Sequence, residues 1–252
     1  MPIALAEPSE EFLRIAAEQA AVSQHYAALG AAMAFDPDAG LGGKLVFAGD
    51  LMQSPYLLRA TNIAGAASLA ASADAAAGRA AMRDGVIDFL VTSLDEALRI
   101  LKNEIRKRQP VSVSVAVEPQ EIIRHMLDRG VLPDLLPGIL HENVQAFLDH
   151  GALRLAEEAP EPYLFWTVAS DFSRWMPRLN ACVRDAVATV PWQSRWLRLA
   201  PRYLGRSAQR VHGLALGVEA RIRARQAIEA LLSSAAAAGE AIPAVSIGET
   251  AL

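Results

Sequence analysis

The sequence predicts an α/β fold: a doubly wound parallel sheet with an N-terminal helix and a C-terminal helical extension. Two observations predict it. Short apolar runs such as KLVFAG, IDFLVT and VSVSVAV alternate with segments of helical period, a rhythm typical of βαβ units with right-handed crossovers. The chain has 252 residues, 52% of them hydrophobic, which is enough to bury the core of such a sheet.

The chain begins with a predicted helix. From Ser9 to about Ala34 the apolar residues recur at helical spacing, and Ser9 is a suitable N-cap. The stretch FDPDAGLGG that follows has the composition of a linker. We therefore predict an N-terminal helix and linker over residues 1–43.

The strand and helix units are predicted over residues 44–190. The clearest helix starts at Ser93, because SLDE is a capping box in which Ser93 and Glu96 satisfy each other's backbone amides. It ends in the basic run KNEIRKRQP, where cations favour the helix dipole. After Gly138 we expect a helix in ILHENVQAFLDHG, a further strand of the domain in PYLFWTVAS and a helix over 172–188.

The last part, residues 191–252, is predicted to be a helical extension with a flexible tail of small residues. Its segment WQSRWLRLAPRYLGRSAQR interleaves aromatic residues with arginines. The simplest interpretation is that Trp196, Leu197, Leu199 and Tyr203 cover the sheet while the arginines reach solvent. The alternative is a protein partner, for which Trp192, Trp196, Arg198, Arg202 and Arg206 are the residues to mutate.

Charge and composition exclude several classes of protein. The net charge of −4 gives no reason to expect nucleic acid as a partner. The N-terminus lacks the pattern of a signal peptide and no apolar run reaches the length of a membrane span, so we expect a cytoplasmic protein. Cys182 is the single cysteine and lies among apolar residues at helical spacing, which indicates a buried thiol.

Common catalytic motifs are missing from the sequence. It contains neither a GxSxG elbow nor a GxxxxGK[ST] loop. The five histidines are scattered without the spacing of metal ligands, so we expect no metal site. His141 lies near a predicted helix start and is interpreted as a surface or capping residue.

Several segments resemble the central NAD-binding, Rossmann-like domain of urocanase (urocanate hydratase). They are GKLVFAGDL with NIAGAASL, DGVIDFLVTSLDEALRIL, QPVSVSVAVEPQEIIRHMLDRGVLPDLLPG and PYLFWTVASD. The resemblance covers roughly residues 43–138 and 160–188. It implies a Rossmann-like fold in which NAD acts as an electrophile toward the imidazole of urocanate while water is added, and hence a place in histidine degradation.

The sequence departs from the family pattern where chemistry is expected. The family's glycine-rich turn, of the form GGLGGMGGAQP, corresponds here to GDLMQSPYLLRAT, which keeps Gly49 but places Met52, Gln53, Ser54, Pro55 and Tyr56 where glycines would let phosphate approach. Asp50 adds a carboxylate near the same point. The family's DQTSxHxP signature, its cysteine-bearing loop and the arginine of GPFRWV have no counterpart.

Two hypotheses remain open from the sequence. The first is a urocanase-like pseudoenzyme, without urocanate hydration and without NAD, that binds a small molecule or a protein. The second is an active lyase that uses NAD on urocanate or a related unsaturated imidazole acid. If a cofactor or small molecule binds, we expect it at Gly49, Asp50, Ser54, Tyr56 and Asn62, with the loops after Val117 and Leu136 as walls.

Overall fold

The computed structural model describes residues 5–138, 144–156, 161–205 and 207–250. The chain divides into two compact units, one formed by Met1–Gln24 with Ala159–Leu252 and the other by His25–Glu158. Helix α1 (Glu10–Ala32) contributes to both. It confirms the predicted N-terminal helix, and the Ser9 Oγ accepts a hydrogen bond of 3.3 Å from the amide of Phe12, as expected of an N-cap.

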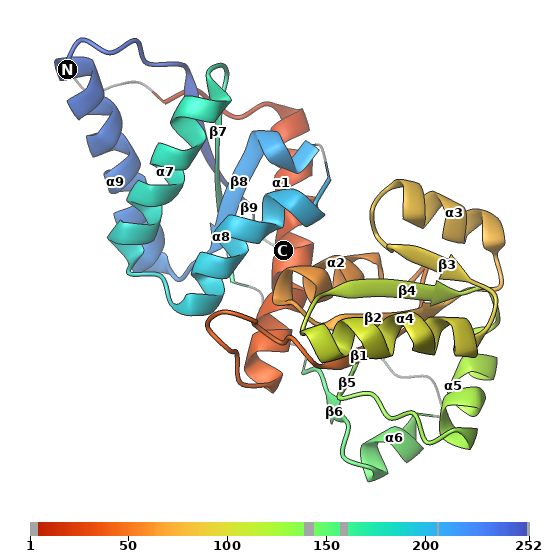
Figure 1. The fold of residues 1–252 in the computed structure, drawn as a ribbon. Helices are drawn as coiled ribbons and strands as arrows, with labels where there is room; N and C mark the ends of the chain where they lie inside the picture. The colour runs from red at the N-terminus through yellow and green to blue at the C-terminus, as the bar shows by residue number, and fades with distance from the viewer. Residues whose placement is uncertain (1–4, 139–143, 157–160, 206, 251–252) are drawn as a thin grey trace. The chain divides into compact units, whose positions relative to one another are not determined.

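The unit of residues 25–158 contains a six-stranded parallel sheet in the order β3-β4-β2-β1-β5-β6 (Figure 1). Its strands are β1 (Leu45–Asp50), β2 (Ala67–Ala71), β3 (Phe89–Val91), β4 (Val111–Val115), β5 (Leu135–Leu136) and β6 (Leu153–Arg154). Its helices are α2 (Pro55–Ala64), α3 (Ala75–Arg83), α4 (Leu94–Lys107), α5 (Pro119–Asp128) and α6 (Gln145–Asp149). The alternation of strands and helices confirms the predicted α/β fold.

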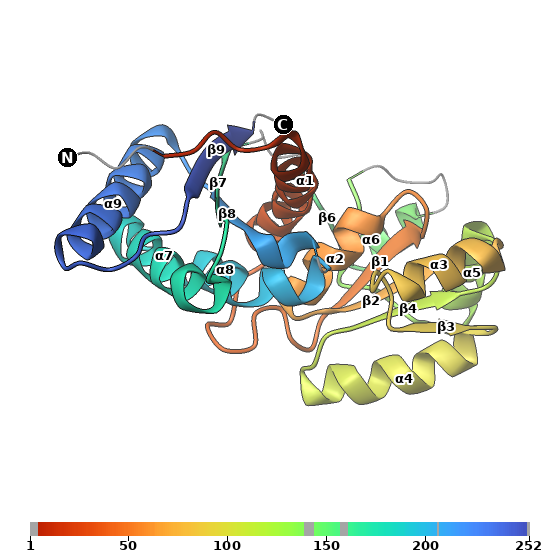
Figure 2. The same ribbon diagram turned by 90° about the horizontal axis from the view of Figure 1, so that it is seen from above.

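Helices cover both faces of this sheet. Phe47, Leu69 and Val113 are neighbours across three strands and belong to one buried core with α4, α5 and α6. Figure 2 shows α4 on one side of the strands and α2 and α3 on the other. The central strands are buried on both sides, which is why β1 and β2 read as continuous apolar or small-residue runs. β4 is buried throughout as well, although its sequence alternates valine with serine.

The capping box at Ser93 is present in a modified form. The Ser93 Oγ accepts a hydrogen bond of 3.3 Å from the amide of Glu96, as predicted. The Glu96 carboxylate, however, accepts its hydrogen bond of 2.9 Å from the amide of Thr92, one residue before the N-cap.

The other unit has a three-stranded antiparallel sheet of order β8-β7-β9. Its strands are β7 (Tyr163–Val168), β8 (Val211–Ala215) and β9 (Val245–Thr250). Its helices are α7 (Phe172–Val187), α8 (Pro191–Tyr203) and α9 (Val218–Ala237), with the short 3-10 helix η1 (Ser207–Arg210) before β8. The Trp166 side chain bonds to Asn180 of α7, whereas Tyr163 packs on Trp196 of α8, so helices cover both faces of this sheet too.

Three expectations differ from the structure in this region. Residues 163–168 form a strand as predicted, but β7 pairs antiparallel with β8 and β9 and is not part of the parallel sheet. The expected domain of residues 44–190 is thus divided near residue 158. The expected flexible tail contains β9, which pairs with β7 over six positions. The cause is long-range pairing, because each of these strands has partners far away in the sequence.

Two glycines give β7 its place in the sheet. A Cβ atom at Gly213 would lie 2.4 Å from Cε1 of Tyr163, and one at Gly248 would lie 2.3 Å from Cζ of Phe165. The rings of Tyr163 and Phe165 therefore occupy the space that a side chain at Gly213 or Gly248 would need. Among the described residues, none of the helices is long and apolar enough to cross a membrane.

Candidate functional site

The turn between β1 and α2 is the expected binding point of a dinucleotide, because it follows the central strand and opens a helix. Gly49 has a φ of +75°, a conformation that residues with a Cβ avoid. The register between β1 and β2 also shifts between Phe47 and Gly49. The chain therefore bulges at Gly49 and leaves the sheet in a tight turn.

The backbone of this turn is satisfied by its own residues. The Asp50 Oδ1 accepts a hydrogen bond of 2.7 Å from the amide of Met52. The Asp50 carbonyl accepts one of 3.2 Å from the amide of Gln53. In a phosphate-binding turn such amides are directed at the ligand; here two of them bind Asp50.

The start of α2 is also unlike a phosphate cradle. The Ser54 hydroxyl donates a hydrogen bond of 2.6 Å to the carbonyl of Ala48 and makes no capping bond to the helix. Pro55 occupies the first turn and has no amide to donate. Met52 and Tyr56 are exposed by 61% and 40%, respectively, so apolar side chains stand where a pyrophosphate would lie.

Asn62 is not part of the turn. It is buried in the last part of α2, where its Oδ1 accepts a hydrogen bond of 2.9 Å from Ser112. The Ser112 hydroxyl in turn accepts one of 2.9 Å from Ser68 on β2. Four of the five predicted residues thus surround the turn, while Asn62 fastens α2 to the sheet. The serines in VSVSV were the signal that one face of β4 is polar.

The neighbouring loops carry carboxylates that the sequence analysis did not single out. Asp74 is the N-cap of α3, and its Oδ1 accepts hydrogen bonds of 2.8 and 3.1 Å from the amides of Ala76 and Ala77. Glu118 is exposed and precedes α5. Asp74 was recognisable as an N-cap, since it precedes an alanine-rich helix. The loop after Leu136 runs into residues 139–143, which lie outside the described structure, as does His141.

These residues do not fit the pyrophosphate of NAD in the manner of a glycine-rich turn. The Asp50 carboxylate occupies one backbone amide of the turn, that of Met52, and its charge repels a phosphate at the same point. Ser54 donates its proton inward and Pro55 supplies none. Among the described residues, no group of three or more histidine, cysteine, aspartate or glutamate side chains is arranged to hold a cation between such charges.

The proposed partner residues of α8 separate into two sets. Trp196 is buried to 1% exposure, and its Nε1 donates a hydrogen bond of 3.0 Å to the carbonyl of Gly213. It is a core residue, so its place among the partner residues was wrong. Arg198 and Arg202 are exposed and Trp192 is half-buried; Arg206 lies outside the described residues. The simpler interpretation of this segment is confirmed for Trp196 and Leu197, which are buried, whereas Leu199 and Tyr203 are only half-buried.

A small cavity lies between β8 and α8. Its lining includes Gln19, Tyr163, Trp196 and His212, and its volume is about 10 Å³, the room of a single water molecule. Burial raises the pKa of the Tyr163 hydroxyl and lowers the pKa of His212 to about 4. The cavity is too small for a metabolite, and its polar groups are neutral at pH 7.

Cys182 is half-buried on α7, and burial raises the pKa of its thiol to about 11. It donates a hydrogen bond of 3.2 Å to the carbonyl of Leu179. A thiol with a raised pKa is a poor nucleophile at neutral pH, although Cys182 is less buried than the sequence predicted.

Comparison with known protein families finds a match for part of the chain. Residues 37–154 match the family model described as the urocanase Rossmann-like domain. The matched segment begins ahead of β1 and ends with β6, so it contains the whole parallel sheet. The part of the resemblance placed at residues 160–188 lies outside the match, consistent with the position of β7 in the other unit. Residues 37–154, slightly less than half of the chain, are therefore a urocanase Rossmann-like domain.

Proposed function

We propose that this protein, although it contains a urocanase Rossmann-like domain, does not hydrate urocanate and serves as a binding domain, with a protein as its partner. Urocanate hydration in the family depends on NAD, and the carrying observation is the hydrogen bond of 2.7 Å from the Met52 amide to Asp50. This bond makes the Met52 amide unavailable to a phosphate, and the Asp50 carboxylate adds a negative charge at the same position. The missing DQTSxHxP signature and the missing cysteine-bearing loop support the same proposal.

The cofactor proposal is tested on the purified protein. We expect no NAD by mass spectrometry after denaturation, and we expect urocanate to keep its ultraviolet absorption during incubation with protein and added NAD. A urocanase with the glycine-rich turn, treated in the same way, is the positive control. Stoichiometric release of NAD, or loss of the urocanate band, would overturn the proposal and support the active lyase.

The binding role is assigned to the exposed side of α8. Arg198 and Arg202 lie one helical turn apart and both are exposed, and arginine is enriched where proteins meet other proteins. Because Trp196 and Leu197 face the core, the two arginines can be changed without disturbing the packing.

A pull-down tests this role. We expect Arg198→Ala/Arg202→Ala to lose partners that the wild type captures. The matched control is Arg184→Ala/Arg223→Ala, which removes the same charge from exposed positions of α7 and α9. Equal capture by the wild type and the α8 variant would exclude this surface, and equal loss by both variants would indicate a nonspecific charge effect.

A further inference from the structure

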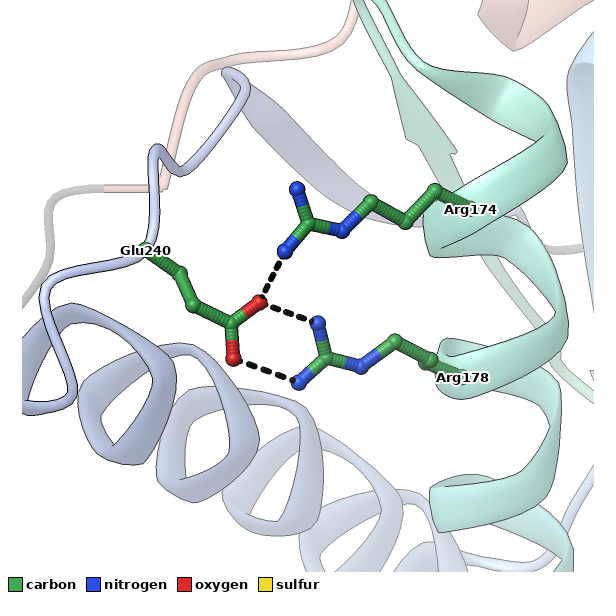
Figure 3. A network of polar contacts seen from close by, with 3 residues as sticks. All are labelled: Arg174, Arg178 and Glu240. Carbon is green, nitrogen blue, oxygen red and sulfur yellow. Dashed lines mark hydrogen bonds and ion pairs between the residues drawn. The ribbon is translucent and has the colours of Figure 1, made fainter.

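Two arginines of α7 share one carboxylate from a distant part of the chain. Arg178 donates hydrogen bonds of 2.7 and 3.3 Å to Oε2 and Oε1 of Glu240, and Arg174 donates to Oε2 as well. Figure 3 shows both guanidinium groups extending from α7 toward the Glu240 side chain. Arginine forks bind carboxylates and phosphates in this planar, multidentate way.

The cluster has more positive charge and more donors than Glu240 can satisfy. Two guanidinium groups and one carboxylate have a net charge of about +1 at pH 7. The hydrogen bond from Arg178, followed by that from Arg174, lowers the pKa of Glu240, so the carboxylate stays ionised. The cluster is therefore short of anionic oxygen atoms.

Trp175 adds an independent sign of this shortage. The guanidinium of Arg178 lies 4.4 Å from the centre of the Trp175 ring, and that of Arg174 lies 5.7 Å from it. The Trp175 side chain is fully buried, and its Nε1 has no hydrogen-bond partner among the described residues. A buried donor without an acceptor lowers the stability of a protein. The unpaired donor here belongs to Trp175, the residue over whose ring both guanidinium groups lie.

Glu240 directly follows the C-terminal end of α9. It lies between Ala237, the last residue of α9, and Val245, the first residue of β9. Gly239 has a φ of +79°, and the Glu240 amide donates a hydrogen bond of 3.0 Å to the carbonyl of Ala235, so this backbone caps the helix. The carboxylate can nevertheless leave the arginines by rotation of the Glu240 side chain, without unfolding of α7 or α9.

We propose that Arg174 and Arg178 form a binding site for a phosphate-type dianion, and that Glu240 is an internal competitor that occupies the site in the free protein. A dianion neutralises both guanidinium groups, whereas Glu240 neutralises one. The three terminal oxygens of a phosphate group also offer more hydrogen-bond acceptors than the two oxygens of a carboxylate. The site lies in the unit outside the urocanase Rossmann-like domain and does not depend on the function proposed above.

A second arginine pair in the same unit provides a matched control. Arg221 and Arg225 lie one turn apart on α9 and both form ion pairs with Glu249. Only Arg221 donates a hydrogen bond to Glu249, while Arg225 lies 3.6 Å from it, so these two guanidinium groups do not converge on one carboxylate as Arg174 and Arg178 do. Glu249→Gln therefore removes the same charge as Glu240→Gln without freeing two converging guanidinium groups.

The experiment measures binding of inorganic phosphate by titration calorimetry at constant ionic strength. We expect weak binding by the wild type and binding tighter by about tenfold in Glu240→Gln, since an intramolecular competitor is removed. Glu249→Gln is expected to bind as the wild type does. Equal phosphate affinity in all three proteins would overturn the proposal, because that is the result expected if Glu240 only forms a structural ion pair with the arginines.

Further measurements test whether the arginine fork itself binds the phosphate and which kind of phosphate the site prefers. Arg178→Lys in the Glu240→Gln background keeps the charge but loses the fork, and we expect about tenfold weaker binding than in Glu240→Gln alone. If Glu240→Gln does not fold, the phosphate-dependent rise in melting temperature of the wild type must disappear in Arg178→Lys; an unchanged rise would overturn the proposal. Titration with phosphoserine separates two sources of the ligand: tighter binding than that of inorganic phosphate assigns the site to a phosphorylated side chain, and equal binding assigns it to free phosphate.

Discussion

The indole Nε1 of Trp196 donates a hydrogen bond of 3.0 Å to the backbone carbonyl of Gly213, and this bond closes the open edge of a sheet. β8 is an outer strand. The Leu216 amide donates a hydrogen bond of 3.2 Å to the Pro162 carbonyl, which shows that even-numbered residues of β8 have their backbone groups directed at β7. Because this direction alternates along an antiparallel strand, the carbonyls of Val211 and Gly213 are directed away from β7. The Gln19 Nε2 donates a bond of 2.8 Å to the Val211 carbonyl in the same way. Side chains from α8 and α1 thus occupy positions that another strand would use.

Trp196 is accordingly expected to matter for folding and not for partner binding. Trp196→Ala should lower the free energy of unfolding by about 3–5 kcal/mol, the usual cost of deleting a large buried aromatic side chain. Arg198→Ala on the exposed side of the same helix should change it by less than about 0.5 kcal/mol. Urea denaturation followed by circular dichroism measures both. Comparable losses in the two variants would contradict the division of α8 into a core face and an exposed face.

Adding a methyl group at Gly213 or Gly248 should destabilise the antiparallel sheet. The new Cβ would lie 2.4 Å from the Tyr163 ring or 2.3 Å from the Phe165 ring, and overpacking of this kind costs about 1–3 kcal/mol. Gly30→Ala in α1 is the control, because a Cβ there meets no atom within 4 Å. In a helix that change should be neutral or stabilising by up to about 1 kcal/mol. Thermal unfolding of the three variants tests the order.

Asn62 is expected to act on stability without affecting any ligand. Asn62→Ala leaves the buried Ser112 hydroxyl without the acceptor that it now has at 2.9 Å, at a cost of about 1–3 kcal/mol. Asp50→Asn keeps an acceptor for the Met52 amide and should unfold at the same urea concentration as the wild type. A midpoint for Asn62→Ala equal to that of the wild type would show that α2 is held to the sheet by other contacts.

His212 should make the protein sensitive to mild acid. Its Nδ1 lies 2.8 Å from Nδ2 and 3.1 Å from Oδ1 of Asn180, and the same Oδ1 accepts a bond of 3.0 Å from the Trp166 indole. Burial lowers the pKa of His212 from 6.5 to about 4. Below pH 6.5 the unfolded chain therefore binds a proton that the native protein does not. The contribution of His212 should lower the stability between pH 6.5 and 4, by about 1.4 kcal/mol for each unit of pH, and this contribution should change no further below pH 4.

The measurement for His212 is urea denaturation at several pH values. His212→Gln removes the titrating ring, so the part of the slope that His212 causes should disappear in this variant. Its stability at pH 7 need not equal that of the wild type, because only the slopes are compared. Identical slopes for the two proteins between pH 6.5 and 4 would show that other groups cause the acid sensitivity.

Local sequence signals were reliable where structure is local. The N-cap at Ser9, the start of α4 at Ser93 and the order of strands from Leu45 to Leu136 followed from capping residues and apolar runs. The position of the β1–α2 turn followed as well, because a strand, a glycine and a helix start are adjacent in the chain. Asn62 was misjudged because its partner, Ser112, lies fifty positions away, and sequence spacing carries no information about such a contact.

The sequence by itself determined the alternation of strands and helices, the family of the central domain and the loss of glycines from its turn, since these depend on neighbouring residues. Only the tertiary structure decided that β7 leaves the parallel sheet, that Trp196 belongs to the core, and that Arg174 and Arg178 meet Glu240. The reason is physical: strand pairing and charge pairing join residues that are distant in the chain, and many partners are chemically equivalent until the backbone brings one of them close. The turn at Gly49 needed both sources of information. The sequence showed which glycines are missing, and the structure showed that the Asp50 carboxylate binds the Met52 amide of this turn.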